Sequence, residues 1–104
     1  MTPSEISGIY RLAFMPEALE EWRRLDNSIK ELLRKALKKR LIQPRMPGSE
    51  LYGDLRHCYK IKLRKQGYRL VYTVEDDRLV VLVLTIDKRE DMAAYQSALL
   101  RLSR

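Results

Sequence analysis

The chain has 104 residues, a length typical of one domain whose core is large enough to fold alone. Its composition is that of an ordinary globular protein, but a net charge of +7 and a pI near 9.8 favour a polyanionic partner: nucleic acid, an anionic membrane surface or an acidic protein. One Cys excludes an internal disulfide and a Cys-built metal site, and one His argues against a metal centre.

The sequence contains no apolar run of about 18 residues, and its N-terminus has no apolar signal-peptide core. We therefore expect a cytoplasmic protein with no membrane partner. The polar residues 1–8 are expected to form a loose tail ahead of one domain over residues 9–104.

The first half of the chain predicts one strand and two helices. Residues 9–14 alternate as a strand does, and Pro16 suits the first turn of a helix that buries Trp22 in the core. After a break, the segment from Ser28 to Glu31 has the form of a capping box, which predicts the start of a second helix. The apolar stripe of that helix comprises Ile29, Leu32, Leu33, Ala36, Leu37 and Leu41.

The opposite face of the second predicted helix is strongly basic. It carries Lys30, Arg34, Lys35, Lys38, Lys39 and Arg40. Such a face is either simply solvated or an electrostatic footprint for RNA phosphates, and the pattern does not choose between the two. Pro44, Pro47 and Gly48 then predict the end of the helix and a loop.

Residues 58–72 read CYKIKLRKQGYRLVY and predict a β-hairpin. Apolar and mostly basic positions alternate on both sides of a short connection, residues 64–67, which ends in a glycine. The spacing of the two runs therefore allows the register of the hairpin to be predicted from the loop.

Pairing Leu63 with Tyr68 across that loop places Lys62 directly opposite Arg69 and puts Lys60 on the same face of the sheet. Like charges in directly opposed positions destabilise a sheet. A face of this kind is therefore either well solvated or used to hold an anion.

The last third of the chain predicts an interior strand and a short helix. After a turn at residues 76–77, residues 79–86 are nearly all apolar, as in a strand covered on both faces. Residues 87–91 are expected to form a polar hinge. One side of the C-terminal helix would comprise Met92, Tyr95, Ala98, Leu99 and Leu102.

This order of elements predicts an α+β fold. The N-terminal helical pair would pack on one face of a small antiparallel-type mixed sheet, and a C-terminal helix would follow. The cluster of Lys60, Lys62 and Arg69 would lie on the opposite, concave face.

Three features occur together and in order: the hairpin, the hydrophobic strand followed by DKRE, and Tyr95 six residues past Arg89. With the helical segments at residues 18–22 and 28–37, they resemble the RelE toxins of bacterial type II toxin–antitoxin modules over roughly residues 9–102. The resemblance implies the RelE/ParE-like fold, which is similar to that of microbial ribonucleases.

The loop before the hairpin departs from the family pattern. It has Tyr52 where the family has an Arg, and one extra residue within residues 53–57.

The resemblance implies a ribosome-dependent endoribonuclease. Members of the family enter the ribosomal A site and cut mRNA there by attack of the 2′-hydroxyl on the adjacent phosphate, which leaves a 2′,3′-cyclic phosphate and inhibits translation. The family positions that carry this activity fall on Lys60, Lys62, Arg69, Arg89 and Tyr95. No cofactor or metal is implied.

The implied residues suit a reaction that needs a base, positive charge for the phosphorane and an acid for the leaving oxygen. Crowding of cations favours the neutral form of a lysine amine. We expect Lys62 to act as the base, with Lys60 supporting it and binding phosphate. Arg69 would neutralise the scissile phosphate, Arg89 would act on the leaving side and Tyr95 would stack on a message base.

Several of these residues also have a plainer explanation. Tyr95 could be a core residue and Arg89 a surface charge. His57, beside the hairpin, is expected to be structural, and Cys58 a small buried apolar residue.

The implied partners are the ribosome, mRNA and a RelB-like antitoxin, whose acidic segment would displace the C-terminal helix. Operator DNA would be bound only through the toxin–antitoxin complex. RNA contacts are expected from Lys30, Arg34, Lys35, Lys38, Lys39 and Arg56. Two other functions stay open: a ParE-like gyrase-inhibiting toxin, and a non-catalytic RNA- or ribosome-binding module.

Overall fold

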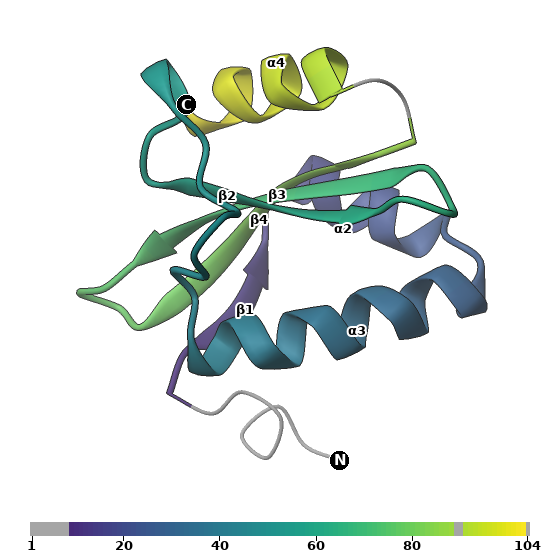
Figure 1. Ribbon diagram of the computed structural model, residues 1–104, viewed down its shortest axis with the longest axis horizontal. Coiled ribbons are helices and arrows are strands. Elements are labelled where there is room, and N and C mark those ends of the chain that lie inside the picture. The colour runs from purple at the N-terminus through teal and green to yellow at the C-terminus, as the bar shows by residue number, and fades with distance from the viewer. Residues whose placement is uncertain (1–8, 89–90, 104) are drawn as a thin grey trace.

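The computed structural model describes residues 9–88 and 91–103, which form an α+β fold (Figure 1). Its elements in chain order are β1 (Arg11–Phe14), α2 (Pro16–Arg23), α3 (Asn27–Ile42), the 3-10 turn η1 (Gly53–Leu55), β2 (Cys58–Leu63), β3 (Tyr68–Glu75), β4 (Val80–Asp87) and α4 (Asp91–Leu102). The predicted order of strands and helices is therefore confirmed. None of the helices described is long and apolar enough to span a membrane.

The four strands form one sheet in the order β1-β4-β3-β2. β1 runs parallel to β4, and the other neighbouring strands are antiparallel. Helices α2 and α3 cover one face of the sheet and α4 lies over the other (Figure 1). The nearly continuous apolar sequence of β4 follows from its interior position, because both of its faces are covered.

Alternate residues of β2 point into two separate cores. The larger core lies under α3, which contributes the buried side chains Ile29, Leu33, Leu37 and Leu41. The smaller core lies between the sheet and α4 and comprises Leu51, Leu55, Cys58, Val71, Leu84 and Ala98. Because Cys58 belongs to the smaller core, the period of two places Lys60 and Lys62 on the α4 face.

A β-bulge interrupts the register between β3 and β4. Val71 lies opposite Thr85. The next residue, Tyr72, lies opposite Val83, which leaves Leu84 as an extra residue in β4. The bulge shifts the last part of β4 by one residue relative to β3.

Three predicted strand boundaries differ from the structure. β1 begins two residues later than predicted, at Arg11, because the Tyr10 N–H donates to the Leu41 carbonyl of α3 (3.1 Å) rather than to β4. The last strand begins one residue late, because Leu79 occupies the preceding turn with a φ of 53°. That strand also continues through Asp87, a residue predicted to lie in the hinge.

The predicted capping box is wrong. Helix α3 begins at Asn27, with Asp26 in the N-cap position and no side-chain cap bond there. Ser28 therefore lies inside the first turn, and Glu31 accepts a hydrogen bond from Arg34 instead of capping the helix start.

The predicted apolar side of the C-terminal helix is confirmed for Ala98 and Tyr95, which lie in or against the smaller core, and is wrong for its other residues. Helix α4 packs on the sheet through Ala94 and Ala98, whose side chains are fully buried. Met92, Leu99 and Leu102 are exposed. The small inward residues bring α4 close to the sheet and leave its larger apolar residues outside.

Candidate functional site

The predicted hairpin register is confirmed. Leu63 pairs with Tyr68, and Lys62 therefore lies directly opposite Arg69. Lys60 is two residues from Lys62 on the same strand and shares its face. All three cations are half-exposed, on the face of the sheet that also carries α4. The structure thus brings together the predicted cluster of Lys60, Lys62 and Arg69.

A hollow of about 240 Å³ lies at the loop end of the hairpin. It is lined by Lys62, Leu63, Arg64, Gly67, Tyr68 and Arg69. The loop is held by a hydrogen bond from the Gly67 N–H to the Leu63 carbonyl (2.8 Å), and Gly67 has a φ of 77°, which only glycine adopts readily. The Arg69 guanidinium donates to the Gly67 carbonyl (3.1 Å), so the loop fixes the arginine at the edge of the hollow.

An acidic residue adjoins this cluster. Asp87 of β4 lies directly opposite Arg69, so Lys62, Arg69 and Asp87 form a row across three strands. Sequence reasoning placed Asp87 in the hinge. The register of the β3–β4 turn alone would put Ile86 opposite Arg69, and the extra residue of the bulge moves Asp87 there instead. A bulge inside an apolar strand has no clear sequence signal.

The prediction that Arg40 lies on the solvated basic face of α3 is wrong. Its side chain turns inwards and donates to the Lys60 carbonyl (3.1 Å), the Ser49 hydroxyl (3.3 Å) and the Tyr72 hydroxyl (3.0 Å). The Tyr72 hydroxyl in turn donates to the Pro44 carbonyl (2.5 Å). This network fixes the backbone of β2 at Lys60 from the face of the sheet that α3 covers.

The remaining candidate residues fall into separate places. Tyr95 lies on α4, half-buried against the smaller core, and so on the same side of the sheet as the cations. Arg89 lies outside the described residues, as do residues 1–8. His57 is exposed, and Cys58 is buried as expected, with burial raising the pKa of its thiol.

The basic residues expected to contact RNA do not adjoin the cation cluster. The side chains of Arg34, Lys35, Lys38 and Lys39 are exposed on α3, on the opposite side of the sheet, and Lys30 is half-exposed there. Arg56 is exposed next to η1. Two basic surfaces thus lie on opposite sides of the sheet.

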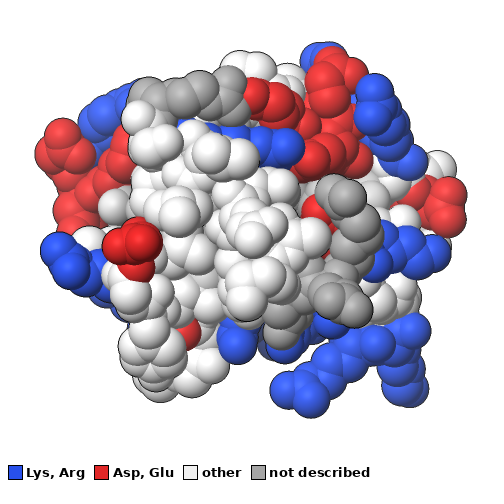
Figure 2. Space-filling model, turned by 90° about the horizontal axis from the view of Figure 1, so that it is seen from above, with Lys and Arg blue, Asp and Glu red and all other residues white. Residues whose placement is uncertain are grey.

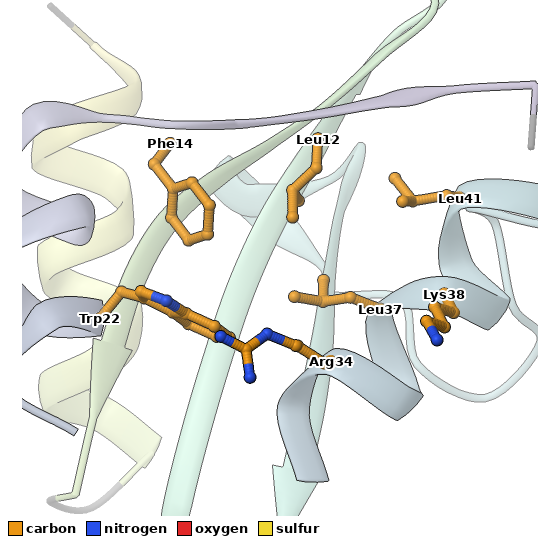
Figure 3. Close-up of a pocket in the computed structure, with 7 residues that line it drawn as sticks. All are labelled: Leu12, Phe14, Trp22, Arg34, Leu37, Lys38 and Leu41. Atoms are coloured by element: carbon orange, nitrogen blue, oxygen red, sulfur yellow. The ribbon is translucent and has the colours of Figure 1, made fainter. Parts of the chain in front are cut away.

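An apolar groove of about 210 Å³ lies between β1, α2 and α3 (Figure 3). Trp22 packs against the larger core there, with the Phe14 ring centroid 5.5 Å away and the Arg34 guanidinium 5.6 Å over its ring. Lys38 lines the groove as well. The predicted packing role of Trp22 is therefore confirmed.

Within residues 9–88 and 91–103, no group of three or more His, Cys, Asp or Glu side chains could hold a metal ion. The chemistry of the cluster is instead that of closely spaced cations, which can bind a phosphate and stabilise added negative charge on it.

Comparison with known proteins identifies the class. A family model described as the ParE toxin of the type II toxin–antitoxin system parDE matches residues 12–93. The fold and this match define the chain as a toxin of a type II toxin–antitoxin system. Within that class it belongs to the RelE family: it is 45% identical to the "mRNA interferase toxin RelE" of Escherichia coli strain K12 over 93 residues, which cover 89% of this chain and 97% of that relative.

Solved structures agree with this assignment. A double mutant of E. coli RelE in the free state is 44% identical and superposes with a TM-score of 0.81, covering 90% of this chain and 98% of that one. The toxin in the intact E. coli RelBE toxin–antitoxin complex is 47% identical with a TM-score of 0.74, covering 78% and 98%. The family resemblance and the fold class expected from the sequence are confirmed.

Proposed function

We propose that this protein is a ribosome-dependent endoribonuclease that cuts mRNA in the ribosomal A site and thereby inhibits translation. One observation carries the proposal: Lys60, Lys62 and Arg69 share one face of a rigid strand pair in a chain 45% identical to an mRNA interferase. Phosphate transfer within RNA needs positive charge fixed where the phosphorane develops, and a paired strand supplies that fixity.

The proposed reaction is intramolecular. Lys62 takes the proton of the 2′-hydroxyl, the oxygen attacks the adjacent phosphorus, and the 5′-oxygen leaves as a 2′,3′-cyclic phosphate forms. Lys60 and Arg69 bind the non-bridging oxygens and hold the charge that builds on them. Arg89 stabilises the negative charge on the leaving 5′-oxygen, which takes up a proton from solvent to become the 5′-hydroxyl. Tyr95 stacks on a message base and aligns the ribose.

The basic surface of α3 would contact ribosomal RNA separately from the cation cluster. It comprises Lys30, Arg34, Lys35, Lys38 and Lys39. Arg56, which lies next to η1, would add a further RNA contact. Phosphate contacts by such residues set affinity and its salt dependence without reading sequence. Because α3 and the cation cluster lie on opposite sides of the sheet, ribosomal RNA can be held on one side while message lies on the other.

The proposed protein partner is a RelB-like antitoxin. Support comes from the RelBE complex, in which a toxin 47% identical to this chain is bound to its antitoxin. The net charge of +7 fits an acidic partner. Operator DNA would be reached only through that complex, and the proposed site of action is the cytoplasm.

Primer extension on a message under translation tests the proposal. The wild-type protein should give discrete cuts within codons, while Lys62→Ala and Arg69→Ala should each reduce cutting by about 100-fold or more. Lys65→Ala, an exposed lysine in the hairpin loop, is the matched control and should cut normally. Full cutting by both site variants would overturn the assignment, as would robust cutting of naked RNA by the purified protein.

A second candidate function is that of a gyrase-inhibiting toxin, because the matching family model is described as a ParE toxin. ParE-like toxins poison gyrase. Cells that express the protein distinguish the two functions. Intact message together with DNA breaks in those cells would favour the gyrase poison over the ribonuclease.

A further inference from the structure

Two side chains distant in sequence complete an open strand edge. β1 pairs with β4 only over residues 80–83, and the last bond of this kind runs from the Met15 N–H to the Val83 carbonyl (2.9 Å). Beyond it, Glu21 of α2 accepts a hydrogen bond from the Ile86 N–H (3.0 Å). Arg101 of α4 donates to the Leu84 carbonyl (2.8 Å).

Glu21 and Arg101 also bind each other. The Arg101 Nη1 lies 2.8 Å from the Glu21 Oε1, and Nη2 lies 3.0 Å from Oε2, which is a bidentate pair. The two side chains are 14% and 27% exposed, for Arg101 and Glu21 respectively, so water screens the pair only in part. Glu21 raises the pKa of Arg101, as expected for a close carboxylate. We call this arrangement, with its two bonds to the β4 backbone, the Glu21–Arg101 clamp.

Apart from Tyr95, which is half-buried against the smaller core, the described side chains of α4 bury only a small apolar area. The fully buried side chains of α4 are those of Ala94 and Ala98, which bury little apolar area. Its large apolar residues face outwards: Met92 and Leu100 are 64% and 70% exposed. Figure 2 shows the molecule from the α4 side, and the middle of that face is largely uncharged. The clamp is therefore a main attachment of α4 to the sheet and to α2.

We infer that Glu21 and Arg101 are positioning residues for the proposed cleavage, which hold α4 on the sheet and so fix Tyr95 on the face that carries the cation cluster. The inference rests on the proposed function, because Tyr95 matters only if the cluster acts on RNA. Both residues act through the helix that carries Tyr95.

In the clamp the two charges cannot be exchanged, because each side chain also bonds a backbone group of β4. A charge reversal, Glu21→Arg with Arg101→Glu, would restore the attraction between the two side chains. It would also set an arginine donor against the Ile86 N–H and a carboxylate against the Leu84 carbonyl. We therefore expect the double reversal to fail, whereas Arg101→Lys should rescue in part because it keeps one charged donor.

Hydrogen exchange of the purified protein without RNA tests the clamp itself. In Arg101→Met, the protection of α4 amides should fall by about 100-fold, with that of β2 and β3 unchanged. Arg23→Met removes an exposed ion pair to Glu20 on the same α2 helix and should leave α4 protected. Unchanged protection of α4 in Arg101→Met, or full protection in the charge-reversed double variant, would overturn the inference.

Cleavage on ribosomes tests the positioning role. Arg101→Met should lower the maximal cutting rate by roughly 10-fold or more and leave the half-saturating ribosome concentration unchanged. Arg101→Met should cause no further loss of cutting in a Tyr95→Ala background. General destabilisation would instead lower the cutting rate by the same factor in the wild-type and the Tyr95→Ala backgrounds. Equal loss in both backgrounds would overturn the positioning role. If the wild type cuts nothing, the proposed ribonuclease fails while hydrogen exchange still reports on the clamp.

Discussion

Lys62 and Arg69 lie directly opposite each other on β2 and β3, and Asp87 of β4 lies directly beyond Arg69. The row contains one repulsive and one attractive contact between neighbouring strands. Opposite charges in facing positions stabilise a sheet, whereas like charges in such positions destabilise it. Asp87 therefore offsets the cost of keeping two cations side by side.

Removing that anion should expose the repulsion. We expect Asp87→Asn to destabilise the protein by about 1 kcal/mol, and less at high salt. Adding Lys62→Gln to Asp87→Asn should recover part of the loss, because it removes one of the two cations. Thermal melting at low and high salt measures both effects. Asp77→Asn, at an exposed turn position, is the control, and additive effects of the two site changes would contradict the argument.

Arg40 should matter for stability far more than its neighbours on α3. Arg40→Met leaves the Lys60 carbonyl and the Tyr72 hydroxyl without their charged donor, and we expect a loss of about 2 to 3 kcal/mol in the free energy of unfolding. Lys39→Met, at the preceding position, which is exposed, should change the free energy of unfolding by less than about 0.5 kcal/mol. Denaturant unfolding compares the two. Equal effects would mean that the inward network contributes nothing.

Asp76 should make stability depend on pH in the acid range. Hydrogen bonds from Arg45 and from the Tyr10 hydroxyl hold the pKa of Asp76 below its usual range. The resulting stabilisation is present above the unfolded-state pKa of about 3.9 and is lost as the pH falls through the lower folded-state pKa. Asp76→Asn should therefore lower the melting temperature near neutral pH, and the difference from wild type should shrink on acidification. A constant difference down to the lowest pH would contradict this account.

Cys58 reports on the opening of the smaller core. Its side chain is fully buried, and burial raises the pKa of the thiol, so little thiolate is present or accessible in the native protein. A disulfide thiol reagent should react slowly with native protein and rapidly after denaturation. Cys58→Ala provides the blank. Rapid reaction of the native protein would place the thiol outside the core.

Part of the site could be read from the sequence because the interactions that set it are local. Alternation of side chains and a four-residue loop ending in Gly67 determine the hairpin register, since a slip of one residue would expose Ile61 and bury Lys62. The position of the cation cluster follows from that register.

Other features could not be read because their patterns have more than one solution. The C-terminal helix has apolar residues on several sides, and the sequence does not reveal that Ala94, rather than Met92 or Leu99, faces the sheet. The segment around Ser28 has the letters of a capping box, but Asp26 takes the N-cap position one residue before the helix begins.

The sequence by itself determined the order of the elements, the basic hairpin and the shared face of its three cations, because each depends on residues within a few positions of one another. The tertiary structure alone decided the placement of Asp87 beside Arg69, the inward turn of Arg40 and the Glu21–Arg101 clamp. These contacts join segments up to 80 residues apart. They depend on a bulge and on how two helical layers settle on the sheet, and no local pattern carries that information.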